Sequence, residues 1–261
     1  LFLSKKIFPI DTENFTPSYW ENKESQISEP FTYEYADGWS NLWEYAYTIN
    51  YMLFLLLAIS LANVFSVEYY RKTDAIILCS KYGKKQLYFS KILAGITFSV
   101  VSAVLLFIAT LLSSVFVYGT NGFHAALQLI FPFSSWNISV GGSILILFFS
   151  LIAISVLYGC VIMLLSAILK SNVAVMAVPV GIMILTMMVD VPYQFRLASQ
   201  VYDLLPTNLL NTTELWDDRL ICILGRYFTN FQIAPFLYLV FAVLLILVGM
   251  VIYQRHQVQA R

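Results

Sequence analysis

Five long stretches of this sequence are apolar and free of acidic and basic residues, and they constrain the fold more than any other feature. A helix needs about 20 residues to cross the hydrocarbon core of a membrane, which is about 30 Å thick. Charged residues make up 11% of the chain, against about 25% in soluble domains. The sequence therefore predicts an all-α, polytopic membrane helical bundle. Its five predicted spans are residues 45–67, 92–118, 143–169, 173–189 and 233–253.

Basic residues are divided unevenly between the two sets of segments that connect these spans. One set holds six of the fifteen Lys and Arg residues, and the other, although much shorter, holds nine. Basic residues near a span resist translocation, so we expect the second set to be cytoplasmic. This orientation predicts a multi-pass cell-membrane protein with its N-terminal segment outside and its C-terminus in the cytoplasm. The first set is 1–44, 119–142 and 190–232, and the second is 68–91, 170–172 and 254–261.

The N-terminal segment, residues 1–44, is acidic and precedes the transmembrane domain of residues 45–261. The printed sequence opens at Leu1 with no leader in front of this outer segment. We therefore expect a sixth span upstream of Leu1, with residues 1–3 as its last part. A cleaved secretory leader is the alternative, and it leaves five spans.

The connection 68–91 is the most informative predicted cytoplasmic segment. Thr73 or Asp74 can cap a short helix, and Gly83 can end it. We expect this helix to lie across the membrane surface, with a second helix starting near Lys84. A simple interfacial helix held by Lys and aromatic anchors is the alternative interpretation.

The residues of this connection resemble a known family. A Glu and an Arg end the preceding span, and they are followed by Ile-Ile-Leu-x-Ser at 76–80, Tyr-Gly-Lys-Lys-Gln-Leu at 82–87 and Ser-Lys-Ile-Leu at 90–93. This pattern is similar to that of the ABC-2 type permeases, the transmembrane subunits of ATP-binding cassette transporters. The resemblance implies six spans, a partner subunit that binds ATP and Mg, a second permease subunit in a homo- or heterodimer, and a coupling helix that docks on the ATPase. It assigns to that interface Glu68, Arg71, Lys72, Thr73, Asp74, Ile76, Ile77, Ser80 and Lys81.

Glu68 has a second interpretation. Its spacing from Arg71 and Lys72 permits a surface ion pair at i+3 or i+4, worth about 0.5 kcal/mol. Partner contact and structural pairing therefore both stay open for this residue.

Two further segments carry expectations about packing. The turn 170–172 is so short that the flanking spans must form a tight antiparallel hairpin. Ser155 with Gly159, and Ala177 with Gly181, have the small-xxx-small spacing of closely packed helices.

The long connection 190–232 has two apolar patches that are too short to span a membrane. The resemblance implies short helices that re-enter the outer leaflet there, and a folded outer loop is the alternative.

Motifs for covalent chemistry and nucleotide binding are missing from the sequence. It has no G-x-x-x-x-G-K-[ST] phosphate-binding loop, and its two histidines, His124 and His256, lie outside the predicted spans. Its net charge of zero gives it no general attraction for nucleic acid. We expect a permease that is not itself an enzyme, with no metal or cofactor in this chain and the lipid bilayer as its surroundings.

The spans carry scattered hydroxyls and amides but no acidic or basic side chains. Such helices disfavour ion and proton pathways and suit an amphiphilic or hydrophobic substrate, such as a peptide, a drug or a lipid-like molecule. We expect an ABC-type exporter, with Asn63 as a pathway residue or as part of an interhelical hydrogen bond. A subunit for self-protection against antimicrobial peptides is the alternative within transport. A receptor or sensor that does not transport is the alternative from another class, and a membrane-embedded enzyme ranks third.

Overall fold

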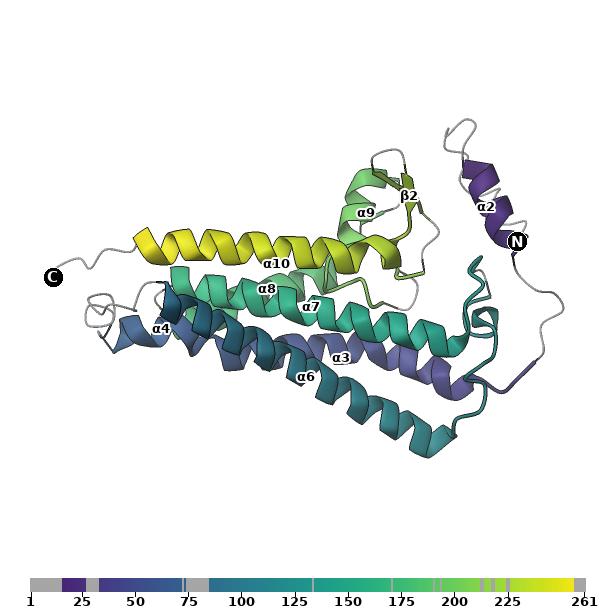
Figure 1. Ribbon diagram of the computed structural model, residues 1–261, viewed down its shortest axis with the longest axis horizontal. Coiled ribbons are helices and arrows are strands. Elements are labelled where there is room, and N and C mark those ends of the chain that lie inside the picture. The colour runs from purple at the N-terminus through teal and green to yellow at the C-terminus, as the bar shows by residue number, and fades with distance from the viewer. Residues whose placement is uncertain are drawn as a thin grey trace.

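The computed structural model describes residues 16–26, 33–71, 73, 85–132, 134–169, 171–189, 191–192, 194–211, 214–216, 219–223 and 226–255. This part of the chain is mostly helical (Figure 1). Its α-helices are α2 (Thr16–Glu24), α3 (Asp37–Leu61), α4 (Asn63–Tyr70), α6 (Gln86–Tyr118), α7 (Val140–Ile168), α8 (Asn172–Met188), α9 (Arg196–Asp203) and α10 (Asn230–Arg255), with a 3-10 turn at Leu127–Leu129.

Four helical segments are long and apolar enough to cross a membrane. They are α3 continued through the first part of α4, then α6, α7 and α10. The predicted span 173–189 corresponds to α8 (Asn172–Met188), which has 17 residues and is therefore only about 25 Å long. The structure thus supports four full-length spans and leaves the count of five unconfirmed.

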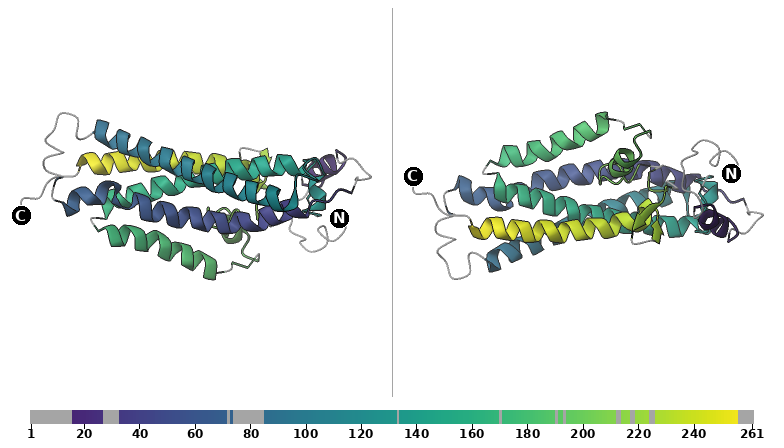
Figure 2. Two further views of the ribbon diagram at one scale, coloured as in Figure 1. Left: turned by 90° about the horizontal axis from the view of Figure 1, so that it is seen from below. Right: turned by 90° about the horizontal axis from the view of Figure 1, so that it is seen from above.

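Helix α7 is the centre of the bundle and contacts α3, α4, α6, α8 and α10. Figure 2 places α8 at one edge of the bundle and α6 at the other in both views. Helices α6 and α10 are mostly exposed along their apolar length, whereas α7 is mostly buried. An apolar face that the protein leaves uncovered suits contact with lipid or with another membrane protein.

Gly159 of α7 allows a close contact with α6. A Cβ on Gly159 would overlap the Ser99 hydroxyl of α6, so the absence of a side chain at 159 is what lets these two helices approach. Gly181 of α8 faces open space instead. The close approach expected within the α7–α8 hairpin therefore occurs between α7 and α6, because Gly159 faces α6.

The connection 190–232 departs from the all-α prediction. It contains α9 and a short antiparallel hairpin of β1 (Ile221–Ile223) and β2 (Arg226–Phe228), paired with Ile221 opposite Phe228. Isoleucine and aromatic residues favour strands, and three residues are too few for a helix to form in isolation. Figure 1 shows α9 and the hairpin beside the first part of α10.

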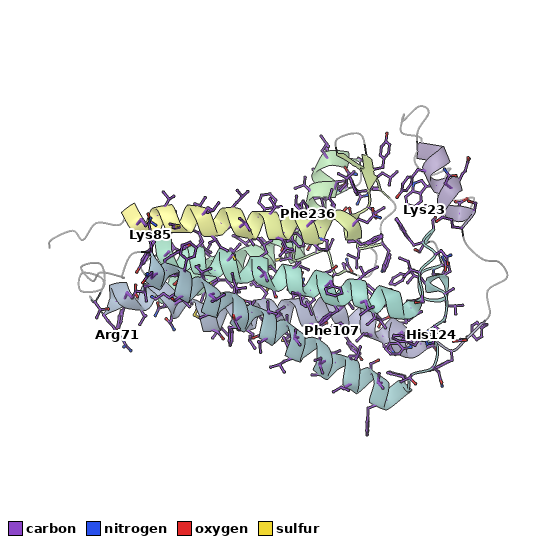
Figure 3. The ribbon with its side chains drawn as sticks, viewed as in Figure 1. Lys23, Arg71, Lys85, Phe107, His124 and Phe236 are labelled. Carbon is purple, nitrogen blue, oxygen red and sulfur yellow. The ribbon has the colours of Figure 1, made fainter. Side chains whose placement is uncertain are left out.

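Basic side chains and a histidine lie at the two ends of the bundle. Arg71 and Lys85 lie at the end where α10 ends, which we call the C-terminal end, and Lys23 and His124 lie at the opposite end (Figure 3). Phe107 lies between them. The end of α4, the start of α6, the α7–α8 turn and the end of α10 all share the C-terminal end (Figure 1). The helix ends that border the three predicted cytoplasmic segments are therefore grouped at one end of the bundle.

Candidate functional site

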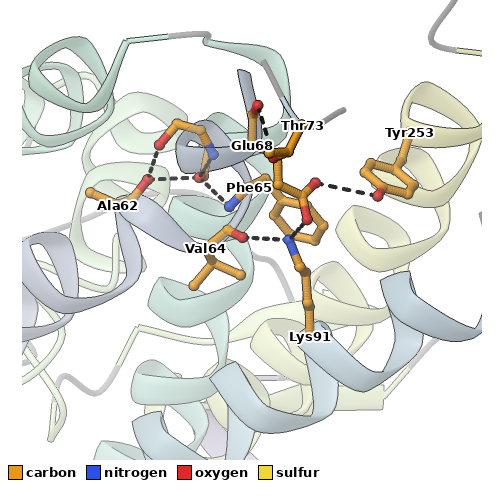
Figure 4. Close-up of polar contacts among 9 residues, drawn as sticks. Ala62, Val64, Phe65, Glu68, Thr73, Lys91 and Tyr253 are labelled. Carbon is orange, nitrogen blue, oxygen red and sulfur yellow. Dashed lines mark hydrogen bonds and ion pairs between the residues drawn. The ribbon is translucent and has the colours of Figure 1, made fainter. Parts of the chain in front are cut away.

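A charged cluster joins helices α4, α6 and α10 at the C-terminal end of the bundle. The Lys91 ammonium of α6 forms an ion pair with a carboxylate oxygen of Glu68 on α4. It also donates to the Val64 carbonyl at 2.7 Å, and its Nζ lies 4.7 Å from the centre of the Phe65 ring. The Tyr253 hydroxyl of α10 donates to the second carboxylate oxygen of Glu68 at 3.4 Å. Figure 4 shows these contacts converging on Glu68 and Lys91.

Aromatic rings shield this cluster from water. Phe65, Tyr88 and Tyr253 come from α4, α6 and α10, and their ring centres lie 5.4 to 5.6 Å apart. All three are buried, and Glu68 itself is only 8% exposed. A buried charge needs a partner because it has lost its hydration, and removing one member of a buried pair commonly costs about 3 to 5 kcal/mol. The burial therefore makes Glu68 and Lys91 depend on each other.

The geometry corrects the surface pair that the sequence allows for Glu68. Its ionic partner is Lys91 of the next helix, and Arg71 is exposed at the end of α4. Thr73 remains close, because its N–H donates to the Glu68 carbonyl at 3.0 Å and continues the last turn of the helix. The Glu68 side chain faces the bundle, and among the residues that the structure describes Lys91 is the cation that forms an ion pair with it.

Most of the predicted coupling helix lies outside the described residues. This holds for Lys72, Asp74, Ile76, Ile77, Ser80 and Lys81. Of the residues predicted for that interface, the structure describes Glu68, Arg71 and Thr73. Lys91 and Tyr253, which contact Glu68, were not among the predicted site residues. The sequence contained a pattern that could have predicted the pair. Lys91 is the last charged residue before the apolar stretch 92–118, and Glu68 is the first charged residue after the apolar stretch 45–67.

Asn63, the predicted pathway residue, is exposed at the first position of α4. The buried amide on this stretch of chain is Asn50, which is fully buried in α3. Its side-chain N–H donates to the Pro206 carbonyl at 2.7 Å. Asn50 thus ties α3 to the connection that follows α9.

An ion pair and hydrogen bonds also stabilise the connection 190–232. Arg219 forms an ion pair with Asp203 at the end of α9, and it donates to the Ser199 hydroxyl at 2.8 Å. The Tyr238 hydroxyl of α10 donates to the Leu204 carbonyl at 2.7 Å. These contacts hold the polar face of α9, with Ser199 and Asp203, in a buried position. Leu197 and other apolar side chains of the helix are exposed.

Within the part of the chain that the structure describes, no three His, Cys, Asp or Glu side chains gather in a way that could hold a metal ion. The charged cluster supplies a carboxylate, an ammonium and a phenol, which link α4, α6 and α10. No protein-family model, curated protein or solved structure matches the chain.

Proposed function

We propose that this chain is the permease subunit of an ABC-type exporter, with ATP and Mg bound by a separate ATPase subunit. The observation that carries the proposal is the ion pair between Glu68 and Lys91. These residues flank the segment 72–84, which has the sequence pattern of an ABC-2 coupling helix. Movement of a docked segment reaches the spans only if its two ends are firmly attached to them.

The cluster provides that attachment on both sides. Glu68 stands two residues before Tyr70, the last residue of α4, and Lys91 stands in the second turn of α6. Tyr253 adds α10, so a force on the segment 72–84 would act on three helices together. Closure of two ATPase subunits would thereby rock the spans between two states.

The proposed substrate is amphiphilic or hydrophobic. The stretches 92–118, 143–169 and 233–253 contain no Asp, Glu, Lys, Arg or His. Desolvating a small ion there would be unfavourable, whereas burial of apolar surface is favourable by about 25 cal/mol per Å². The uncovered apolar faces of α6 and α10 would be covered by lipid and by a second permease subunit.

The proposal is tested by co-expressing the chain with the ATP-binding cassette subunit encoded nearest to its gene, and by measuring ATP hydrolysis in nanodiscs. We expect the two subunits to purify together, and a hydrophobic cationic peptide or a lipid-like drug to stimulate hydrolysis. Glu68→Gln should lower this stimulation, whereas Glu44→Gln, the same change at an exposed site on α3, should leave it intact.

Two results would contradict the proposal. One is a complex whose ATP hydrolysis responds to sodium, potassium or proton gradients and not to amphiphiles. The other is saturable ligand binding to the chain alone with no ATPase association, which would favour a receptor.

A further inference from the structure

The path from α3 into α4 is interrupted at one residue. Helix α3 ends at Leu61 and α4 begins at Asn63, although the backbone of Ala62 between them has helical dihedral angles. No proline or glycine stands at this point in the sequence. The cause of the break must therefore lie in a neighbouring part of the fold.

That cause is the hydroxyl of Ser166 on α7. In an uninterrupted helix the Ala62 carbonyl would accept the N–H of Ser66. Here the Ser166 hydroxyl donates to the Ala62 carbonyl at 2.7 Å and accepts the N–H groups of Phe65 and Ser66, each at 3.0 Å. A side chain inserted into the backbone hydrogen-bond ladder is a recognised cause of a helix kink.

The Ser166 hydroxyl gives new partners to the Phe65 and Ser66 N–H groups and to the Ala62 carbonyl. Ser166 uses its single hydroxyl proton toward Ala62 and its lone pairs toward two amides, and it is fully buried. Ser66 also donates to the Ala62 carbonyl, at 2.6 Å, and its hydroxyl contacts the Asn172 amide at the start of α8. The break is thus stabilised by α7 and α8, whereas the far end of α4 is held by α6 and α10 through Glu68.

We propose that Ser166 is a positioning residue that forms a hinge between α3 and α4. Its hydroxyl sets the direction of α4 and therefore the position of Tyr70, where α4 ends. The importance of this hinge for transport rests on the proposed function, but the hinge itself does not. Without the hydroxyl, Ser66 N–H can donate to Ala62 again, and α3 and α4 would join into one straighter helix.

The test measures the direction of α4 in the full chain in nanodiscs, without any ATPase subunit. Nitroxide labels are placed at Tyr70, which is 81% exposed, and at either Val173 of α8 or Leu93 of α6, which are 75% and 67% exposed. The background carries replacements of the native cysteines. Figure 2 shows α4 between the starts of α6 and α8, so these two distances report lateral movement.

Ser166→Ala should shift at least one of the two distances. Helix α4 has 8 residues and is about 12 Å long, so a change of about 20° moves its tip by about 4 Å. Ser155→Ala is the matched control: it removes another buried hydroxyl from α7, but one that bonds to the Ile152 carbonyl of its own helix. The control should leave both distances unchanged.

Unchanged distances in Ser166→Ala, or equal shifts in Ser155→Ala, would overturn the hinge. Because alanine is smaller than serine, Ser166→Ala introduces no clash. Both outcomes are read without transport or ATP. If Ser166→Ala shifts a distance but no ATPase partner is found, the proposed function is overturned and the hinge is supported.

Discussion

The ammonium of Lys91 pairs with the carboxylate of Glu68 across 22 intervening residues, and it joins the last turn of α4 to the second turn of α6. The pair is nearly enclosed, since the side chains of Lys91 and Glu68 are 18% and 10% exposed. Hydrogen bonds from Lys91 to Val64 and from Tyr253 to Glu68 complete its surroundings. The C-terminal end of α4 is thereby fixed to two helices that are distant in sequence.

Removal of either member of this pair should destabilise the protein. We expect Glu68→Gln and Lys91→Met each to lower the free energy of unfolding by about 3 kcal/mol, because each leaves a buried charge unpaired. The double variant should lose much less than the sum. Thermal unfolding in nanodiscs measures the coupling, with Glu44→Gln expected within about 0.5 kcal/mol of the parent. Additive losses would show that the two charges do not interact.

Asn50 gives a second prediction, concerning the link between α3 and the connection 190–232. Asn50→Leu removes the donor to the Pro206 carbonyl at a fully buried position. We expect a loss of about 2 kcal/mol, since the carbonyl becomes a buried acceptor without that donor. Asn63→Leu, the same change at an exposed position, should have almost no effect on stability. Limited proteolysis near residues 204–211 should accelerate in Asn50→Leu alone.

Gly159 and Gly181 form a matched pair for testing helix packing. Gly159→Ala places a methyl group against the Ser99 hydroxyl, and overpacking of this kind costs about 1 to 3 kcal/mol. Gly181→Ala enters open space and should stabilise α8 by about 0.5 to 1 kcal/mol. Thermal unfolding should show a lower stability for Gly159→Ala and a higher stability for Gly181→Ala. Adding Ser99→Ala to Gly159→Ala should recover part of the loss, and no recovery would place the clash elsewhere.

The orientation of the bundle is tested by cysteine labelling in intact cells. Ser25 directly follows α2, and both Ser25 and Arg71 are exposed. Lys23 of α2 and Arg71 lie at opposite ends of the structure (Figure 3). In a background that lacks the native cysteines, a membrane-impermeant maleimide should label Ser25→Cys directly. It should label Arg71→Cys only after the cells are opened, because the basic segments are predicted to be cytoplasmic. The reverse pattern would invert the topology and remove the segment 72–84 from contact with a cytoplasmic ATPase.

The sequence by itself determined the helical character of the chain and the approximate limits of its long helices. Apolar runs such as 92–118 and 143–169 correspond closely to α6 (Gln86–Tyr118) and α7 (Val140–Ile168). The prediction succeeds because burial in lipid leaves a single chain segment no way to satisfy its backbone except a helix. The local sequence was enough to predict these helices because their backbone hydrogen bonds form between residues close in sequence.

The tertiary structure decided which side chains contact one another between helices. The sequence offered Arg71 and Lys72 as neighbours of Glu68, but the direction of the side chain selected Lys91. The break at Ala62 has no local signal either, because its cause is a hydroxyl about one hundred residues away on α7. Side-chain pairing between helices depends on which faces meet, and only the packed bundle fixes those faces.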